Sequence, residues 1–356
     1  MSAPIAYHPG KQPIPRNAWY VVAFSREITQ KPLSRRLLGD KVVLYRTENG
    51  QIVALADYCA HRAMPLSAGT VKGDCIQCPY HGLEYDPAGK CANIPSQPQI
   101  PRLMKVRSYP TVERWKWVWA WFGEPERADP SLIPDHSEFG MDNTDFWSVD
   151  RFVMSIGGSY QLLHENLLDL SHVTFLHAGS FDSGAMASAP QSTQVEGRLI
   201  SITREVTEVV GAAYGRIFSL EEGIRVRRTL RSRTWVPSLN VVTSTFHFLD
   251  EPGRPAAVRH SVFPITPETA TTCHYFVGTA HSYGEPAAGD VLKAQNQVLF
   301  DVFLADKTAI EAIQQAYDEL GAATPDCSVR ADEAALKFRR LLDGMIGEEA
   351  GSLAVA

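Results

Sequence analysis

The chain of 356 residues has no long apolar run. No stretch of about 18 uninterrupted apolar residues occurs, and the first twenty residues have no apolar core of the kind found in secretory signals. The chain also has no excess of positive charge, because its net charge is −6, and no run of lysine or arginine is present. These absences predict a cytoplasmic protein that binds neither membrane nor nucleic acid.

Cysteine is too sparse for a disulfide framework, since six cysteines are scattered along the chain. In a reducing compartment, a close group of cysteine and histidine is more typical of a metal site. Cys59 and His61 form a C-x-H motif, and Cys78 and His81 form C-x2-H after sixteen intervening residues, 62 to 77. The two motifs therefore predict a metal site built from two loops.

Two thiolates and two imidazoles could hold tetrahedral zinc or a Rieske [2Fe–2S] cluster, in which two cysteines bind one iron and two histidines bind the other. Zinc sites of this composition usually take both cysteines from one loop and both histidines from another. Here each loop supplies one cysteine and one histidine, as expected if each loop reaches both irons. The pairing favours the Rieske cluster, with a zinc-stabilised binding module as the alternative.

A second group of polar residues lies in an apolar segment. Asn166, Asp169 and His172 recur every three residues, which predicts one polar stripe along a helix. His177 lies roughly 140° further round an ideal helix, so the helix must break before His177 for the two imidazoles to converge. With a carboxylate from elsewhere they would form the facial triad of non-haem Fe(II) oxygenases. The alternative is a buried helix with two hydrogen-bonded histidines.

A helix is predicted for residues 290–320, and an acidic residue on it could supply this carboxylate. Asp301, Asp306 and Glu311 are the candidates on this helix. Their spacing alone does not choose among them.

The remaining pattern indicates two domains. Short strand-like segments lie between residues 19 and 122, and a polar, proline-rich connector at 123–135 predicts a boundary after residue 125. Alternating segments from 147–156 and 199–281, including 214–220, predict further strands. Helical periodicity returns in residues 290–320 and 331–347.

The segments CAHRAMPLSAGTVKGDCIQCPYHG and ENLLDLSHVTFLH resemble the oxygenase components of Rieske non-haem iron oxygenases, in the branch of the vanillate and dicamba O-demethylases. The resemblance implies an α+β protein with a small antiparallel β Rieske domain in residues 1–125. Residues 126–356 are expected to form a helix-grip catalytic domain, in which a curved antiparallel sheet wraps a long C-terminal helix.

The resemblance also implies the metal ligands and their connection. The cluster would be bound by Cys59, His61, Cys78 and His81, and the mononuclear Fe(II) by His172, His177 and Asp306. Asp306 is favoured because the family's acidic ligand is followed by lysine and, further on, by a Glu-Ala pair.

Two further residues receive roles from the resemblance. Asp169 is expected to bridge His172 to the cluster histidine His81 of a neighbouring subunit, which implies a head-to-tail homotrimer. Asn166 is expected beside the iron.

The substrate pocket is expected between the sheet and the C-terminal helix. Its candidate lining residues are His247, Phe263 and Gln297. An arginine from the strand at 225–233 is an alternative polar anchor, although alternating arginines on a strand are more typical of a solvated face.

The implied function is that of a terminal oxygenase. It would use O2 and electrons from NAD(P)H to oxidise a small aromatic compound, with oxidative O-demethylation of an aryl methyl ether or aromatic acid as the first choice. No glycine-rich nucleotide loop is present, so NAD(P)H and flavin would act through a separate iron–sulfur reductase or a ferredoxin. The alternatives are ring or angular dioxygenation and, in another class, a Rieske electron carrier with a ligand-binding domain.

Overall fold

The computed structural model describes residues 8–178, 184–286, 288–321 and 327–353. The chain divides into two compact units, each described here by itself. One comprises Pro15–Ile133 with Thr266–Thr269, and the other comprises Met1–Ile14, Pro134–Ile265 and Ala270–Ala356. The boundary predicted after residue 125 falls inside the first unit and stays a prediction.

The first unit is built from three small sheets, with strand orders β1-β11-β10, β2-β3-β4-β9 and β5-β6-β7-β8. Their strands are β1 Trp19–Phe24, β2 Leu33–Leu37, β3 Asp40–Arg46, β4 Ile52–Ala56, β5 Thr70–Lys72, β6 Cys75–Gln77, β7 Glu84–Tyr85, β8 Cys91–Asn93, β9 Ser108–Tyr109, β10 Thr111–Arg114 and β11 Trp117–Trp121. β1 and β11 pair antiparallel and are buried along their whole length, which explains their nearly continuous apolar sequences.

The second unit contains one seven-stranded sheet in the order β12-β18-β17-β16-β15-β14-β13. Its strands are β12 Trp147–Ile156, β13 Ser192–Glu196, β14 Leu199–Val209, β15 Arg225–Trp235, β16 Leu239–Phe248, β17 Ala257–Pro267 and β18 Cys273–His281. The β12–β18 pair and the hairpins from β13 to β17 are antiparallel. Side chains therefore alternate between the two faces, and one face supplies the wall of the site.

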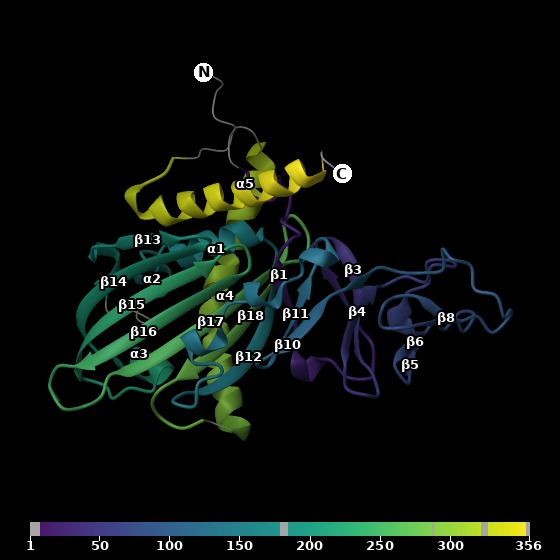
Figure 1. Ribbon diagram of the computed structural model, residues 1–356. Helices are drawn as coiled ribbons and strands as arrows, with labels where there is room; N and C mark the ends of the chain where they lie inside the picture. The colour runs from purple at the N-terminus through teal and green to yellow at the C-terminus, as the bar shows by residue number, and fades with distance from the viewer. Residues whose placement is uncertain (1–7, 179–183, 287, 322–326, 354–356) are drawn as a thin grey trace, which may run out of the picture. The chain divides into compact units, whose positions relative to one another are not determined.

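In the described part of the chain, five α-helices accompany this sheet: α1 Tyr160–Leu168, α2 Val173–Leu176, α3 Ala212–Phe218, α4 Gly289–Leu320 and α5 Glu333–Leu353. In Figure 1, α4 crosses the curved sheet and α5 lies along the edge formed by β13 and β14. This α+β architecture confirms the predicted fold class. No described helix has both the length and the apolarity needed to cross a membrane.

The segment at 214–220 is a correction, because it was predicted as a strand and most of it lies in α3. Tyr214 and Phe218 are four residues apart, so on a helix they share one face, and both pack in a buried cluster with Val226 and Phe246. A short apolar segment does not distinguish helix from strand by its periodicity alone.

Candidate functional site

The two cysteine–histidine motifs lie in two loops of the first unit. Cys59 and Cys78 are 2% and 1% exposed, whereas His61 and His81 are exposed. The two imidazoles face each other, with 3.2 Å between their Nδ1 atoms. The tight turns needed for this arrangement include the left-handed backbone of Gly82, at φ +72°. The loops therefore present a buried thiol pair and an exposed imidazole pair.

This division suits two metal ions better than one. Burial raises the pKa of the Cys78 thiol, so a thiolate there needs a compensating positive charge such as a bound metal. The Cys59 sulfur also contacts the hydroxyl of Tyr85 at 3.2 Å. Among the described residues, the four cysteine and histidine donors do not form one group within 4.8 Å, as a single tetrahedral ion would need. The residues therefore fit a Rieske [2Fe–2S] cluster.

The break between α1 and α2 sets the position of the second histidine pair. The sequence predicted one helical stripe from Asn166 to His172, but the helix already ends before Asp169. The Asp169 carboxylate accepts hydrogen bonds from the backbone N–H and the hydroxyl of Ser171, at 2.9 and 2.5 Å. A short acidic side chain that binds nearby backbone competes with helix formation. The chain therefore turns before His172, earlier than predicted.

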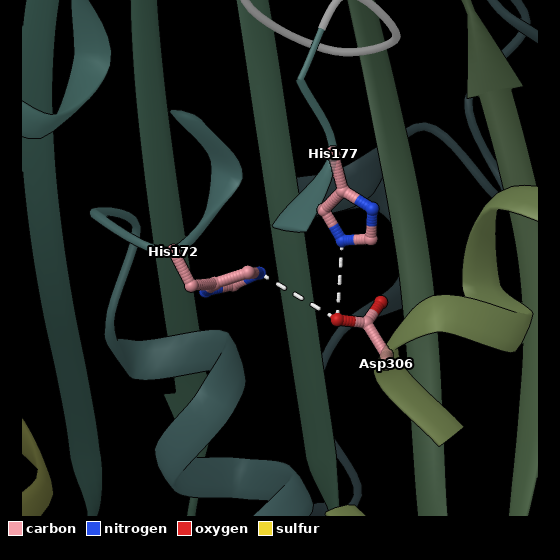
Figure 2. A group of neighbouring side chains, drawn as sticks. All are labelled: His172, His177 and Asp306. Carbon is pink, nitrogen blue, oxygen red and sulfur yellow. Dashed lines mark hydrogen bonds and ion pairs between the residues drawn. The ribbon is translucent and has the colours of Figure 1, made fainter. Parts of the chain in front are cut away.

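His172, His177 and Asp306 form a compact group in the second unit (Figure 2). Asp306 Oδ1 lies 3.1 Å from His177 Nε2 and 3.7 Å from His172 Nε2. All three donor atoms lie within 4.8 Å of one another. The separation of 129 positions between His177 and Asp306 shows that the fold closes this group. Two imidazoles and one carboxylate are the donor set of the 2-His-1-carboxylate iron sites.

Of the three acidic candidates on α4, Asp306 is the one beside the histidines. It is 3% exposed and contacts His177 directly. Asp301 is exposed and accepts a hydrogen bond from Gln297 at 2.7 Å. Glu311 instead accepts the backbone N–H of Gly157, also at 2.7 Å.

His172 is held in the state that metal binding requires. His172 Nδ1 donates to the main-chain carbonyl oxygen of Asp169, which orients the ring and leaves Nε2 directed at Asp306. Burial lowers the pKa of His172, while the Asp306 carboxylate acts in the opposite direction. A neutral imidazole is the form that binds a metal, so the group fits a mononuclear iron. The carboxylate of Asp169 was predicted to contact His172, whereas the observed contact uses its carbonyl group.

Asn166 lies next to this group. Its side-chain N–H2 donates to Asp306 Oδ1 at 3.2 Å. Its amide oxygen is buried and has no partner among the described residues. The predicted place of Asn166 beside the iron agrees with this position, and its role stays a prediction.

A cavity of about 70 Å³ adjoins the group. His172, His177 and Asp306 lie in its lining, and the walls are mostly apolar, including Phe263 and Phe303. At roughly 10–15 Å³ for one water, this space holds about five to seven waters. An apolar cavity with a few polar groups at one place is typical of a site for a small organic compound.

The structure brings one of the three predicted pocket residues, Phe263, to this cavity. His247 lies on the opposite face of β16 from the lining residues Val242 and Ser244, because strand side chains alternate. Gln297 is exposed on α4, where it binds Asp301. The proposed roles of His247 and Gln297 in substrate binding therefore have no support in this geometry.

Two arginines also line the cavity: Arg228, from the strand at 225–233 that was named as an alternative source of a polar anchor, and Arg259, which was not selected from the sequence. They are 2% and 3% exposed, although the arginines around Arg228 were expected on a solvated face. The available signal was the parity of β15, since Arg228 has the same parity as Val226 and Leu230, both buried.

Comparison with known proteins agrees with both sites. Residues 18–110 match the model of the Rieske [2Fe-2S] domain, and residues 156–348 match the vanillate O-demethylase oxygenase C-terminal domain. These ranges contain all seven predicted metal ligands.

Two relatives and one solved structure extend nearly over the whole chain. The oxygenase component of dicamba O-demethylase from Stenotrophomonas maltophilia is 33% identical, over 92% of this chain and 96% of its own. The iron–sulfur subunit of a toluene-4-sulfonate monooxygenase system from Comamonas testosteroni is also 33% identical, over 95% and 99%. The crystal structure of dicamba monooxygenase with non-heme iron and dicamba matches with a TM-score of 0.79 and 29% identity, covering 96% of this chain and 100% of that chain.

Proposed function

The chain belongs to the Rieske oxygenase family that carries the vanillate O-demethylase oxygenase C-terminal domain, and from this membership we propose that it removes the methyl group of an aryl methyl ether. It is an oxidoreductase whose cofactors are a Rieske [2Fe–2S] cluster and a mononuclear iron. The observation that carries the proposal is the group of His172, His177 and Asp306 in the wall of an apolar cavity.

The assignment of ligands rests on the donor sets. Cys59 and Cys78 would hold one iron of the cluster, and His61 and His81 the other. His172, His177 and Asp306 would hold the mononuclear iron and leave positions for O2 and substrate. When bound, these groups supply electron transfer and the reductive activation of O2.

The protein's own residues position the reaction. The Asp169 carbonyl fixes the ring of His172. Phe263 and Phe303 pack against each other with 5.6 Å between ring centroids, and their apolar surface limits access of water to the cavity. The methyl ether is oxidised to a hemiacetal, which releases formaldehyde and a phenol.

Electrons come from NAD(P)H through a separate reductase with flavin and an iron–sulfur centre, or through a ferredoxin. In support, the names of the relatives in Stenotrophomonas maltophilia and Comamonas testosteroni describe a component and a subunit of larger systems. The exposed imidazoles of His61 and His81 provide a surface where an electron can enter or leave. The cytoplasmic location indicated by the sequence stays a prediction.

The protein works as a head-to-tail homotrimer in which Asp169 of one subunit contacts His81 of the next. The half-buried carboxylate of Asp169 and the exposed ring of His81 support this arrangement. So does Phe175, an apolar side chain 77% exposed on α2, between the two iron-binding histidines. Aromatic side chains such as this one are enriched at the centre of protein interfaces.

Formaldehyde release tests the proposed reaction. The holoenzyme is supplied with NADH, a flavin-dependent iron–sulfur reductase and O2, and is offered the 2-, 3- and 4-methoxybenzoates. Formaldehyde and the corresponding phenol are expected in equal amounts. The His172→Ala variant is expected to accept electrons into the cluster without forming product.

Two results would contradict the proposal. A product that keeps its methyl group and gains two hydroxyl oxygens would indicate dioxygenation. Equal cluster reduction in wild type and His172→Ala, with no product from either, would indicate an electron carrier.

A further inference from the structure

Two buried arginines line the cavity beside His172, His177 and Asp306. Apart from that group and these arginines, the lining consists of apolar side chains and two serines. A guanidinium removed from water is costly unless an anion or hydrogen-bond acceptors compensate its charge. The groups that compensate the charges of Arg228 and Arg259 therefore have to be identified.

The two arginines belong to one patch on the sheet. Arg228 lies on β15, and its Nη2 donates to Ser244 Oγ on β16 at 3.0 Å. Ser244 is directly opposite Arg259 on β17 in the strand register. Ser244 thus lies between the two guanidinium groups on three neighbouring strands.

The local charges do not balance. Glu208 lies 3.8 Å from Arg228 and also accepts the hydroxyl of Tyr214 at 2.8 Å. Arg259 donates to the carbonyl oxygen of Ile217 at 2.7 Å, and within the described ranges no carboxylate lies within ion-pair distance of it. Its Nε is buried and has no partner there either. Burial lowers the pKa of Arg259 to about 10, so it remains positively charged at neutral pH.

The patch is displaced along β17 from Phe263, which packs beside the metal-binding group. Phe263 is four residues from Arg259 on the same face of β17, which separates their Cα atoms by roughly 13 Å. Phe263 packs on Phe303, which is one helical turn before Asp306 on α4. A ligand that reaches from Arg259 past Phe263 therefore has its other end at the metal-binding group.

A second cavity, of about 280 Å³, does not supply the missing negative charge. Arg259 lies in its lining together with Arg151 and Arg216, and none of its described lining residues is acidic. Arg259 thus has other arginines near it at both cavities, Arg228 at one and Arg151 and Arg216 at the other, and an anionic ligand would supply the missing negative charge.

We propose that Arg228 and Arg259 bind an anionic group on the aromatic substrate, a carboxylate or a sulfonate, and so direct the opposite end of the ring towards His172, His177 and Asp306. Both groups present oxygen acceptors that match the planar guanidinium fork. The inference rests on the proposed function, since it assigns a substrate class to the same cavity.

The test compares charged and neutral probes of similar shape. Binding of 3-methoxybenzoate, 3-methoxybenzenesulfonate and 3-methoxybenzamide to the anaerobic holoenzyme is measured by isothermal titration calorimetry, and the 2- and 4-methoxy series are measured in the same way. Wild type is expected to bind at least one anion roughly 10- to 100-fold more tightly than its amide. Comparison of the carboxylate with the sulfonate identifies the preferred anion.

The variants assign that preference to residues. Arg259→Gln is expected to abolish the preference for the anion over the amide and to leave amide binding unchanged. This substitution leaves no carboxylate unpaired. Arg228 is replaced together with its partner, as Arg228→Gln/Glu208→Gln, because Arg228→Gln alone would leave Glu208 buried and unpaired. The controls are Arg227→Gln, exposed on the opposite face of β15, and Arg216→Gln, exposed at the second cavity. Both controls should retain the wild-type preference.

The proposal is overturned if no anion in the series binds more tightly than its amide, or if Arg259→Gln weakens acid and amide equally. Arginine-dependent binding of the acid without formaldehyde release would leave this inference standing and contradict the proposed reaction. If acid and amide bind with equal affinity and both release formaldehyde, the proposed reaction stands and this inference is contradicted.

Discussion

At the scale of single residues, a substitution of Asp306 tests the iron site without changing the residues of the cluster site. Asp306→Asn removes the only carboxylate of the predicted iron triad and leaves the cysteine–histidine loops unchanged. We expect iron content to fall from about three to about two per chain, with the Rieske signal in electron paramagnetic resonance retained. Product formation should fall by more than the roughly 10–100-fold typical of losing an outer partner of a metal ligand.

Asp301→Asn is the matched control, because Asp301 is exposed on the same helix and contacts Gln297. It should retain all the iron. Loss of the Rieske signal in Asp306→Asn, or iron loss in Asp301→Asn, would contradict the assignment of the third ligand.

The buried imidazole of His164 is expected to make the free energy of unfolding depend on pH. Burial lowers its pKa to about 3, from an ordinary value of 6.5. The unfolded chain therefore binds a proton at His164 more readily than the folded chain, and stability is lost as pH falls from about 6.5 towards 3. The loss is at most about 1.4 kcal/mol per pH unit for one group.

His164→Phe should remove this contribution, since Phe cannot be protonated and can keep the packing against Phe338. Urea unfolding between pH 7.5 and 4.5 measures the slopes. The variant should lose stability less steeply below pH 6.5 than wild type or His247→Gln. Equal slopes for wild type and His164→Phe would contradict this account.

At the scale of elements, the sequence predicted the strands and the two C-terminal helices more closely than the local break at the metal site. Periodicity identifies β12 and α4, because each is a long segment with a single regular pattern of apolar residues. β1 is recognised instead by its short, continuous apolar sequence. Periodicity also suggested a helix through His172. The competing hydrogen bonds of the Asp169 side chain with Ser171 end it earlier.

The arginines of β15 show a second limit. Strand alternation predicts that neighbouring residues face opposite sides, but it does not say which side is buried. Arg227 is exposed as expected, whereas Arg228 faces the cavity. Contacts with Ser244 and Glu208 on the neighbouring strands help to make this buried position acceptable.

A charged pair joins α1 to α5. Arg339 donates from Nε and Nη2 to the two oxygens of Glu165, each at 2.8 Å, and both side chains are less than one-fifth exposed. Arg339→Lys keeps the charge but loses the fork, so we expect the free energy of unfolding to fall by roughly 1–3 kcal/mol. Chemical denaturation measures the change.

Arg340→Gln serves as the control, because Arg340 is the exposed neighbour on the same helix. A double-mutant cycle with Glu165→Gln should show that the two effects are coupled. Additive effects would mean that the pair does not stabilise the contact between α1 and α5.

At the scale of the whole molecule, the sequence indicated two metal sites in two domains, and the fold class and family agree with it. The motif residues are local in sequence for the cluster, so Cys59, His61, Cys78 and His81 could be identified directly. Asp306 could not be identified from spacing, because it lies 129 positions after His177.

The assembly is the largest feature that stays a prediction. A head-to-tail trimer would cover Phe175, so Phe175→Asp should bury a charge at the interface and dissociate the trimer. Analytical ultracentrifugation should show a trimer for wild type and for Phe175→Leu, and a monomer for Phe175→Asp. A wild-type monomer, or a trimer that Phe175→Asp leaves intact, would contradict this interface.

Metal content, measured together with the visible and electron paramagnetic resonance spectra of anaerobically purified protein, tests the central claim most directly. The account predicts a brown protein with about three irons per chain and, after reduction, a Rieske signal. A colourless protein containing zinc would contradict it. So would a protein that still holds only about two irons per chain after incubation with Fe(II).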